Sequence, residues 1–249
     1  MPTIGAAADP LPGHHRRDPV SRAHGAQASR RGNGPGFFLV LEGAEGAGKT
    51  TQAHLLVEWL EAEGVPCRLA REPGGTPVGE AIREVLLDRG ELEMPPETEL
   101  LLILAARAAY VRDVVRPALE EGVVMVSDRF QLSTFVYQGV ARGLGVKRTR
   151  ELNAFATGGL EPHLTLVFDV PAREGRARQE KDGKVRDRIE GEGEEFLARV
   201  AEGYRTLGAR EPGAFLVDAT PPAGEVHARV RELVAARLPE LSGSGRGSE

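Results

Sequence analysis

The sequence predicts an α/β fold, a doubly wound five-stranded parallel sheet with helices on both faces. The first observation is that short apolar runs alternate along the chain with longer segments of helical periodicity. The second is that glycine-rich or charged segments follow the apolar runs, at the place where open parallel sheets bind ligands. The third is size, because 249 residues with 41% hydrophobic residues suffice for one generous α/β domain.

Five apolar runs are the predicted strands. FFLVLE (37–42) is short and apolar and ends at a glycine, as a buried parallel strand does. The other four predicted strands are 66–70, 123–129, 164–170 and 214–219. Cys67 is the only cysteine and lies in the second strand, so we expect it to be buried. A single cysteine excludes an internal disulfide and a multi-cysteine metal site.

Helices are predicted between the strands. From Ala53 to Leu60, apolar residues recur at i, i+3, i+4 and i+7, which marks one helix face, and Gly64 ends this helix. Further helices are expected from Pro77 to about Asp88, over 96–122, from about Leu132, over 147–156, through Tyr204 and over 224–238. The first half of 96–122 is apolar almost all round, so we expect it to be buried on two sides.

The two ends of the chain differ in composition from the rest. Residues 1–36 are rich in Gly, Pro, Ala and Arg, so we expect a disordered extension, and they lack the apolar segment of a signal peptide. Residues 239–249 are expected to form a flexible tail, which leaves 37–238 as the folded unit. The formal net charge of -5 argues against nucleic acid as the main partner, and no apolar stretch reaches the length of a membrane span.

The segment after the first predicted strand has the pattern of a phosphate-binding loop. GAEGAGKT (43–50) matches G-x-x-x-x-G-K-[ST] at every fixed position, with a strand before it and an amphipathic helix after it. Backbone N–H groups and the helix N-terminus hold phosphate in such a loop, Lys49 reaches the β- and γ-phosphates, and Thr50 offers its hydroxyl to Mg²⁺. The predicted nucleotide-binding residues are Gly43, Ala44, Glu45, Gly46, Ala47, Gly48, Lys49, Thr50 and Thr51.

Glu45 is unexpected in a loop that binds an anion. A carboxylate beside a triphosphate costs several kcal/mol unless a cation or a donor compensates it, even at an effective dielectric constant of about 20. Three orientations are open: toward solvent, toward Mg²⁺ through water, or toward a second ligand that lies across the loop. The downstream motifs favour the second ligand.

Basic residues supply candidates for holding that second ligand. Asp128 ends the third predicted strand, where a carboxylate can meet Mg²⁺ or its waters. Arg129 follows it, and a planar guanidinium matches phosphate oxygens, although a strand-end Asp-Arg pair can also be structural. Arg107 lies on an apolar helical face, so it needs either a buried acid or a ligand in a cleft as its partner. REPGGT (71–76) forms a tight turn after the second strand.

Together these segments resemble bacterial-type thymidylate kinases, a family of P-loop nucleoside monophosphate kinases. The resemblance rests on EGAEGAGKTTQ, REPGGTP, ETELLLILAAR, SDRFQLSTFVYQG and DRIE, within a folded unit from residue 37 to about residue 237. It implies in-line transfer of the γ-phosphoryl group of ATP to dTMP with Mg²⁺ and without a covalent intermediate, which gives dTDP and ADP for dTTP synthesis. It also implies a homodimer through the long helix 97–121, a cytoplasmic location and no membrane partner.

The resemblance gives roles to individual residues. Glu45 would accept a hydrogen bond from the 3′-hydroxyl of dTMP or hold its surroundings, Arg129 would grip the acceptor phosphate, and Arg107 would face the pyrimidine O4. Tyr137 would crowd C2′ against ribonucleotides. The implied acceptor-binding residues are Glu45, Arg71, Glu72, Pro73, Ile103, Arg107, Arg129, Ser133, Tyr137 and Gln138, and the implied metal ligands are Thr50 and Asp128.

Two positions depart from the family pattern. Relatives usually stack an aromatic residue on thymine near position 103, where this chain has Ile103. Apolar packing replaces stacking at some loss of affinity, which bears on base discrimination. Phe130 stands where Tyr or His is more common after Asp-Arg.

The charged segment 173–190 lies between the fourth strand and the next helix. Such a run is commonly a solvated helix with a loop, but nucleoside monophosphate kinases carry a lid over the phosphates at this place. The family pairs an acidic residue of the phosphate loop with arginines of the lid. Arg178, Arg186 and Arg188 are the lid candidates, and with Lys49 and Arg129 they form the predicted catalytic set.

Three other functions fit parts of the pattern. A deoxynucleoside kinase phosphorylates a hydroxyl and uses a carboxylate just after the first strand as its base, and Glu42 has such a position. A neutral acceptor, however, has no need of an arginine clamp and a lid. Kinases for UMP, CMP or AMP are the second alternative. A nucleotide-dependent switch or partner-binding ATPase is the third, although the N-K-x-D motif of switch GTPases is missing after the third strand.

Overall fold

The computed structural model describes residues 35–88, 93–181, 188–189 and 191–238. Its sheet has the strand order β2-β3-β1-β4-β5, and all neighbouring strands are parallel. The strands are β1 (Phe37–Gly43), β2 (Cys67–Arg71), β3 (Val124–Asp128), β4 (Leu164–Asp169) and β5 (Ala214–Asp218). The five predicted strands are confirmed. Most of the predicted extension, the tail 239–249 and Arg186 lie outside the described residues.

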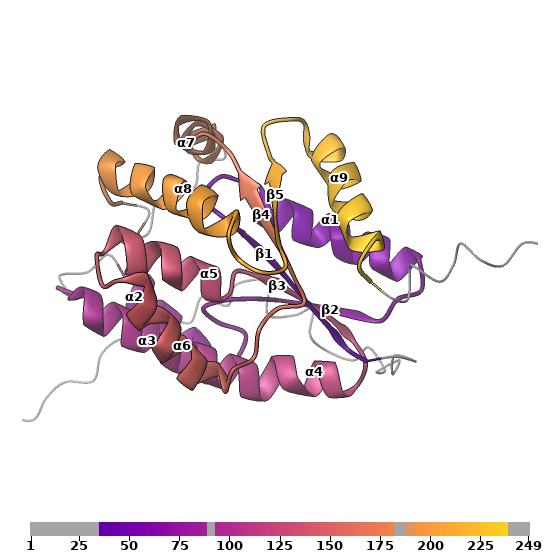
Figure 1. Ribbon diagram of the computed structural model, residues 1–249, viewed down its shortest axis with the longest axis horizontal. Helices are drawn as coiled ribbons and strands as arrows, with labels where there is room; N and C mark the ends of the chain where they lie inside the picture. Colours follow the sequence, from indigo (N-terminus) through magenta and orange to yellow (C-terminus); the bar gives the residue numbers. More distant parts are fainter. Residues whose placement is uncertain (1–34, 89–92, 182–187, 190, 239–249) are drawn as a thin grey trace, which may run out of the picture. The chain divides into compact units, whose positions relative to one another are not determined.

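Helical segments lie on both faces of this sheet, as Figure 1 shows. The helices of one face are α1 (Lys49–Ala62) and α9 (Ala223–Ala235). The other helical elements are α2 (Pro77–Leu87), α3 (Pro96–Tyr110), η2 (Val111–Val115), α4 (Arg116–Glu120), α5 (Gln131–Thr134), η3 (Phe135–Ala141), α6 (Val146–Thr157), α7 (Ala172–Lys181) and α8 (Glu194–Gly208). The doubly wound α/β prediction is therefore confirmed.

The alternation of side chains along β1 builds a core on each face of the sheet. Leu39 and Leu41 pack in the cluster that contains the buried residues of α1 and α9. Phe38 and Val40 point to the opposite face and pack in a second cluster, which includes Tyr110 at the end of α3. Successive residues of a strand face opposite sides, so a strand that is buried on both sides is apolar throughout. This explains the uninterrupted run FFLVL.

Three expectations need correction. The segment 96–122 is not one regular α-helix, because the π-helical η2 lies between α3 and α4. The helix expected from about Leu132 begins at Gln131 and becomes π-helical over η3. Cys67 is only half-buried, since β2 is an edge strand of the sheet.

Among the described residues, no helix has both the length and the apolar character to cross a membrane.

Candidate active site

The phosphate loop joins the carboxyl end of β1 to the first turn of α1. Gly48 caps α1 with φ 83°, in the left-handed region that favours glycine, so the loop turns sharply into the helix. Lys49 is buried, and its Nζ donates to the carbonyl oxygen of Ala44 at 2.8 Å. Burial, and next the positive charge of Arg129, lower the pKa of Lys49 to about 8. The loop, the lysine and the helix N-terminus thus have the arrangement that binds phosphate.

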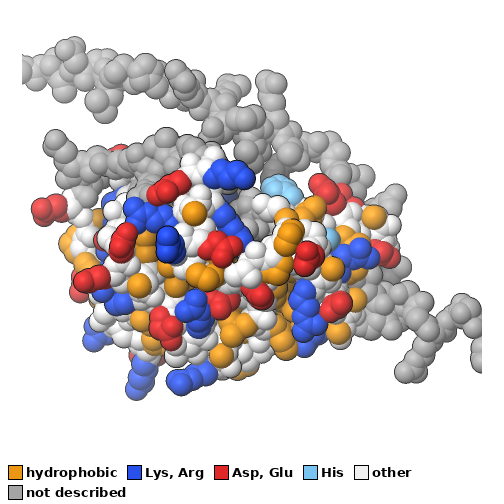
Figure 2. All heavy atoms as spheres, turned by 90° about the horizontal axis from the view of Figure 1, so that it is seen from above, with side chains coloured by type: hydrophobic (Ala, Val, Ile, Leu, Met, Phe, Trp, Pro, Cys, Tyr) orange, Lys and Arg blue, Asp and Glu red, His pale blue; other side chains and the backbone are white. Residues whose placement is uncertain are grey.

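The loop is covered by the first turn of α7. A Cβ at Gly46 would collide with the backbone of Gly175, and a Cβ at Gly175 would lie 2.5 Å from the carbonyl oxygen of Glu45. Two glycines therefore allow the start of the charged 173–190 segment to contact the phosphate loop directly. On the face seen in Figure 2, acidic and basic side chains are interspersed. Anion binding therefore depends on local groups, such as those of the phosphate loop, and not on a field of one sign over the whole face.

Two oxygen ligands suited to Mg²⁺ meet where the first turn of α1 lies beside the end of β3. The Thr50 hydroxyl donates to Oδ2 of Asp128 at 2.6 Å. Within the described ranges, no cluster of three or more His, Cys, Asp or Glu residues could hold a metal by itself. Mg²⁺ usually keeps several waters and takes few protein oxygens beside substrate phosphates. The chemistry of this donor pair therefore fits a nucleotide-bound Mg²⁺.

Arg129 lies at the centre of the predicted acceptor side. Among the residues that the structure describes, it is the one non-glycine residue with a positive φ, 78°. Its Nη1 donates to the carbonyl oxygen of Gly43 at 3.2 Å, to Oγ of Ser133 at 3.2 Å and to the hydroxyl of Tyr204 at 3.0 Å. Its guanidinium also lies over the ring of Tyr137, 5.4 Å from the centroid. Such backbone strain persists where surrounding contacts fix it, which is common in active sites.

Glu45 forms an ion pair with Arg129. Its Oε1 also lies 3.5 Å from the hydroxyl of Tyr137. The orientation toward bulk solvent is therefore wrong, because the carboxylate is turned toward the predicted acceptor side. The negative charge of Glu45 holds the pKa of Arg129 well above its ordinary value, although burial acts in the opposite direction.

A second carboxylate, Glu42, is fully buried beneath this pair. Its Oε1 accepts from the backbone N–H groups of Phe130 and Ser133, and its Oε2 accepts from the hydroxyls of Ser133 and Tyr204. Burial raises the pKa of this carboxyl above its ordinary value, and the donation from Ser133 offsets part of that rise. The sequence did not single out Tyr204 as a site residue, because nothing in the α8 pattern separates it from the core positions around it.

Arg107 has the buried acid that the sequence left open as one of its two partners. Its Nε donates to both carboxylate oxygens of Glu72, at 2.8 and 3.0 Å. Its Nη1 donates to Thr134 and Asn153, and its Nη2 donates to the carbonyl oxygen of Phe130. The arginine is thereby fixed in position, and its role toward a pyrimidine stays a prediction.

Of the remaining predicted acceptor residues, two lie at Arg129 and the others lie elsewhere. Ser133 and Tyr137 lie at Arg129, whereas Gln138 donates to the buried Glu99 at 2.7 Å. Ile103 is buried on α3. At the end of β2, Arg71 pairs with Glu80 on α2, and Pro73 follows Glu72 in the turn after the strand.

The two described lid arginines contact protein groups away from Arg129. Arg178 donates to the carbonyl oxygens of Ala219 and Thr220 and pairs with Glu174. Arg188 donates to the carbonyl oxygen of Leu86 and pairs with Glu99, 2.7 Å away. Their catalytic assignment stays a prediction.

Comparison with known proteins agrees with this geometry. The family model described as thymidylate kinase matches residues 41–230. The chain belongs to the thymidylate kinase family. A thymidylate kinase of Pseudomonas fluorescens (strain SBW25) is 48% identical over 213 residues, which cover 85% of this chain and 99% of that protein. A thymidylate kinase of Synechococcus sp. (strain JA-2-3B'a(2-13)) is 49% identical over 211 residues, 84% of this chain and 99% of its own length.

A solved structure gives the same result for the thymidylate kinase fold. The crystal structure of thymidylate kinase from Ehrlichia chaffeensis matches with a TM-score of 0.64 and 28% identity, over 81% of this chain and 99% of that chain. The predicted family and fold class are confirmed, and so is ATP-dependent phosphorylation of dTMP to dTDP, with Mg²⁺ as the usual kinase cofactor. The structure also argues against the deoxynucleoside kinase alternative. Glu42, its candidate general base, is fully buried and its oxygens already accept hydrogen bonds from protein donors.

Proposed function

We propose that this thymidylate kinase family member transfers the γ-phosphoryl group of MgATP to dTMP between the phosphate loop and Arg129. The Glu45–Arg129 ion pair is the observation that carries this assignment of residues. It joins the loop that suits the donor triphosphate to the arginine that suits a second phosphate. The proposed sites of the two phosphates are thus neighbours across one ion pair, and direct transfer requires such proximity.

On the donor side, the backbone of residues 43–48 and the N-terminus of α1 hold the β-phosphate. Lys49 releases the carbonyl oxygen of Ala44 and reaches the β- and γ-phosphates. Thr50 and Asp128 hold Mg²⁺ directly or through water. When bound, the metal supplies positive charge that neutralises the phosphate oxygens.

On the acceptor side, Arg129 binds the 5′-phosphate of dTMP. A phosphate monoester has a second pKa of about 6, so its attacking oxygen is mostly ionised at neutral pH and needs no general base. The work of the protein is to position two anions and to neutralise their charge. Glu45 accepts a hydrogen bond from the 3′-hydroxyl once the phosphate has taken its place at Arg129.

The nucleoside pocket lies beside this arginine. Tyr137 packs against the sugar, and Ser133 and Gln138 line the pocket with it. Glu72 fixes Arg107 so that a further Nη2 hydrogen is directed at the pyrimidine O4. The other proposed pocket residues are Arg71, Pro73 and Ile103, and the lid arginines Arg178, Arg186 and Arg188 supply charge during transfer.

Two alanine variants test these roles. Lys49→Ala and Arg129→Ala are expected to lower kcat/KM for dTMP phosphorylation by at least about a thousandfold, with the circular dichroism spectrum of the folded protein preserved. ADP release coupled to pyruvate kinase and lactate dehydrogenase measures the rate. Near-normal turnover in both variants would overturn the assignment. Arg229→Ala, in an exposed ion pair on α9, is a matched control for folding.

We further propose a homodimer through residues 97–121 and a cytoplasmic location. The helices α2, α3 and α6 (Figure 1) pack with α3 at their centre, and each of them carries large exposed apolar side chains. They are Val78, Val85, Leu101 and Phe155. Leu101 is 60% exposed, whereas Leu100, Ile103 and Leu104 on the same helix are buried. An exposed leucine of this kind suits burial against a second copy of the chain. Light scattering of Leu101→Glu tests this: a shift to monomer is expected, and an unchanged mass would contradict it.

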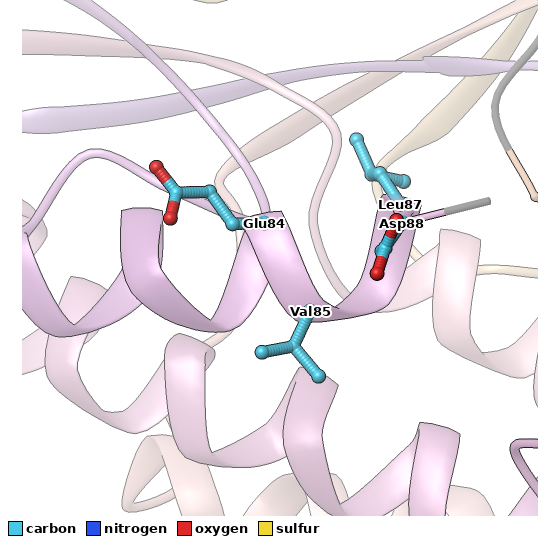
Figure 3. A pocket seen from close by; sticks show the side chains of 4 residues that line it. All are labelled: Glu84, Val85, Leu87 and Asp88. Atoms are coloured by element: carbon cyan, nitrogen blue, oxygen red, sulfur yellow. The ribbon is translucent and has the colours of Figure 1, made fainter. Parts of the chain in front are cut away.

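A shallow hollow near this surface carries no proposed substrate role. Figure 3 shows its lining, Glu84, Val85, Leu87 and Asp88 at the end of α2. It contains none of the residues that bind phosphate or dTMP in the proposed mechanism.

A further inference from the structure

Glu42 is a buried charge that the proposed transfer does not use. It is the next-to-last residue of β1 and is fully buried, directly before the phosphate loop. A buried carboxylate is costly unless donors surround it, and Glu42 has four. The backbone N–H groups of Phe130 and Ser133 lie 2.9 and 3.1 Å from Oε1, and the hydroxyls of Ser133 and Tyr204 lie 2.6 and 3.2 Å from Oε2.

These contacts determine where the hydroxyl hydrogens point. Burial raises the pKa of Glu42, but its hydrogen-bond donors and the nearby charge of Arg129 oppose this effect and favour the ionised carboxylate. An ionised carboxylate only accepts hydrogen bonds, so the Ser133 hydroxyl donates to Glu42. The Tyr204 hydroxyl donates either to Glu42 or to Oγ of Ser133, which is 2.8 Å away. In both arrangements, neither hydrogen points at Arg129.

The two hydroxyl oxygens are therefore left as acceptors for the Arg129 guanidinium. Its Nη1 lies 3.2 Å from Oγ of Ser133 and 3.0 Å from the Tyr204 hydroxyl. The same carboxylate also holds the backbone N–H of Phe130, the residue after the positive-φ Arg129. Glu42 thus acts on both ends of Arg129, its backbone and its guanidinium, without touching either.

We propose that Glu42 is a positioning residue for the acceptor phosphate, which aims Arg129 through the hydroxyls of Ser133 and Tyr204. It neither contacts dTMP nor takes a proton from it. This inference rests on the proposed function, in which Arg129 grips the 5′-phosphate. Its consequence is selective: loss of the Glu42 charge impairs recognition of the phosphate and leaves recognition of the nucleoside intact.

Binding of dTMP and of thymidine separates this role from a purely structural one. In Glu42→Gln the side-chain amide donates toward the hydroxyls, which forces a hydroxyl hydrogen toward Arg129. Calorimetric titration of the full chain is expected to show about tenfold weaker binding of dTMP and an unchanged Kd for thymidine. Glu42→Asp, which remains an acceptor, recovers part of the loss. Equal weakening of both ligands, or no change in either, would overturn the proposal.

Further variants cover a failure of Glu42→Gln to fold and a failure of the proposed function. Tyr204→Phe keeps the carboxylate and removes a hydroxyl that links it to Arg129, so it is expected to show a smaller loss that is again confined to dTMP, and equal losses or none would overturn the inference. Glu211→Gln removes a carboxylate whose partner is Arg150 rather than a residue that contacts Glu42 or Arg129, and is the matched control.

Arg129→Ala tests the premise. If it weakens dTMP but not thymidine while the Glu42 and hydroxyl variants weaken neither, the inference falls and the proposed function stands. If Arg129→Ala produces no selective loss, both fall.

Discussion

The guanidinium of Arg129 and the carboxylate of Glu45 form an ion pair that joins the end of β3 to the phosphate loop. This contact explains how the loop accommodates a negative side chain. The charge of Glu45 is compensated by an arginine, and in the proposed mechanism the phosphate of dTMP competes for the same arginine. In the proposed mechanism, binding of the acceptor therefore redirects Glu45 toward the sugar.

The 3′-hydroxyl of the acceptor tests this role of Glu45. Glu45→Gln removes the charged acceptor of the hydrogen bond, so the advantage of dTMP over 3′-deoxythymidine monophosphate is expected to shrink by about tenfold. Steady-state kcat/KM values for the two acceptors measure the ratio. A variant that keeps the wild-type ratio would show that Glu45 does not read the 3′-hydroxyl.

Lys49 gives the site a predictable pH dependence. Burial and the charge of Arg129 lower the pKa of this lysine to about 8 in the free protein. Only the protonated amine attracts phosphate, so affinity for ATP is expected to fall as the pH rises through about 8. Binding then takes up a proton, because the phosphates raise the pKa of Lys49 again.

Calorimetry in buffers with different ionisation enthalpies measures that proton uptake. Lys49→Arg keeps its charge throughout this range, and its remaining affinity for ATP is expected to be independent of pH. An equally steep pH dependence in that variant would assign the titration to another group.

The Thr50–Asp128 pair predicts a specific metal defect. Asp128→Asn removes the charge beside the threonine hydroxyl, so half-maximal activity is expected to need about tenfold more Mg²⁺. Activity is measured against free Mg²⁺ at saturating ATP, and chelation of the metal abolishes it. Asp218→Asn, at the end of β5, is the matched control. Identical Mg²⁺ requirements in the two variants would remove Asp128 from the metal site.

The glycine contact between the phosphate loop and α7 predicts a large effect of a single methyl group. Gly46→Ala places a Cβ against the backbone of Gly175 and also strains a residue with φ 71°. Gly64 has a similar φ of 75° but no atom within 4 Å of its added Cβ, so Gly64→Ala isolates the backbone cost, about 1–2 kcal/mol. Thermal unfolding and ATP binding are expected to suffer clearly more in Gly46→Ala. Equal losses of stability and ATP affinity in the two variants would show that α7 moves away from the added methyl group at no cost in free energy.

The buried Glu72–Arg107 pair predicts a stability effect. Glu72→Ala leaves a buried guanidinium without its carboxylate, which is expected to lower the free energy of unfolding by about 3 kcal/mol. Urea unfolding measures the change. Asp113→Asn, in an exposed pair with Arg112, is expected to have no measurable effect. A Glu72→Ala variant as stable as that control would contradict the structural role.

The fold could be predicted from the sequence because each of its signals is local. β1 is an uninterrupted apolar run, and α1 begins directly after a complete phosphate-loop pattern. The π-helical segments η2 and η3 could not be predicted, because one wider turn barely alters the apolar spacing. The partial exposure of Cys67 depends on β2 being an edge strand, and the residues of a strand do not by themselves indicate its place in the sheet.

The candidate site could be predicted only in part, for a related reason. Lys49 and Thr50 belong to a contiguous motif, whereas Tyr204 meets Glu42 across a separation of 162 residues. Without a contiguous pattern around it, a tyrosine on the buried face of α8 resembles an ordinary core residue. The partner of Glu45 was equally hidden, because an ion pair between two loops has no sequence spacing of its own.

ADP production with a panel of acceptors tests the central claim most directly. The chain is incubated with MgATP and, in turn, dTMP, dUMP, UMP, CMP, AMP and thymidine, and the initial rates are compared. The account predicts rapid ADP release with dTMP, slower release with the other monophosphates, and essentially none with thymidine, which has no phosphate for Arg129. Rapid phosphorylation of thymidine, or ADP release that is independent of any acceptor, would contradict it.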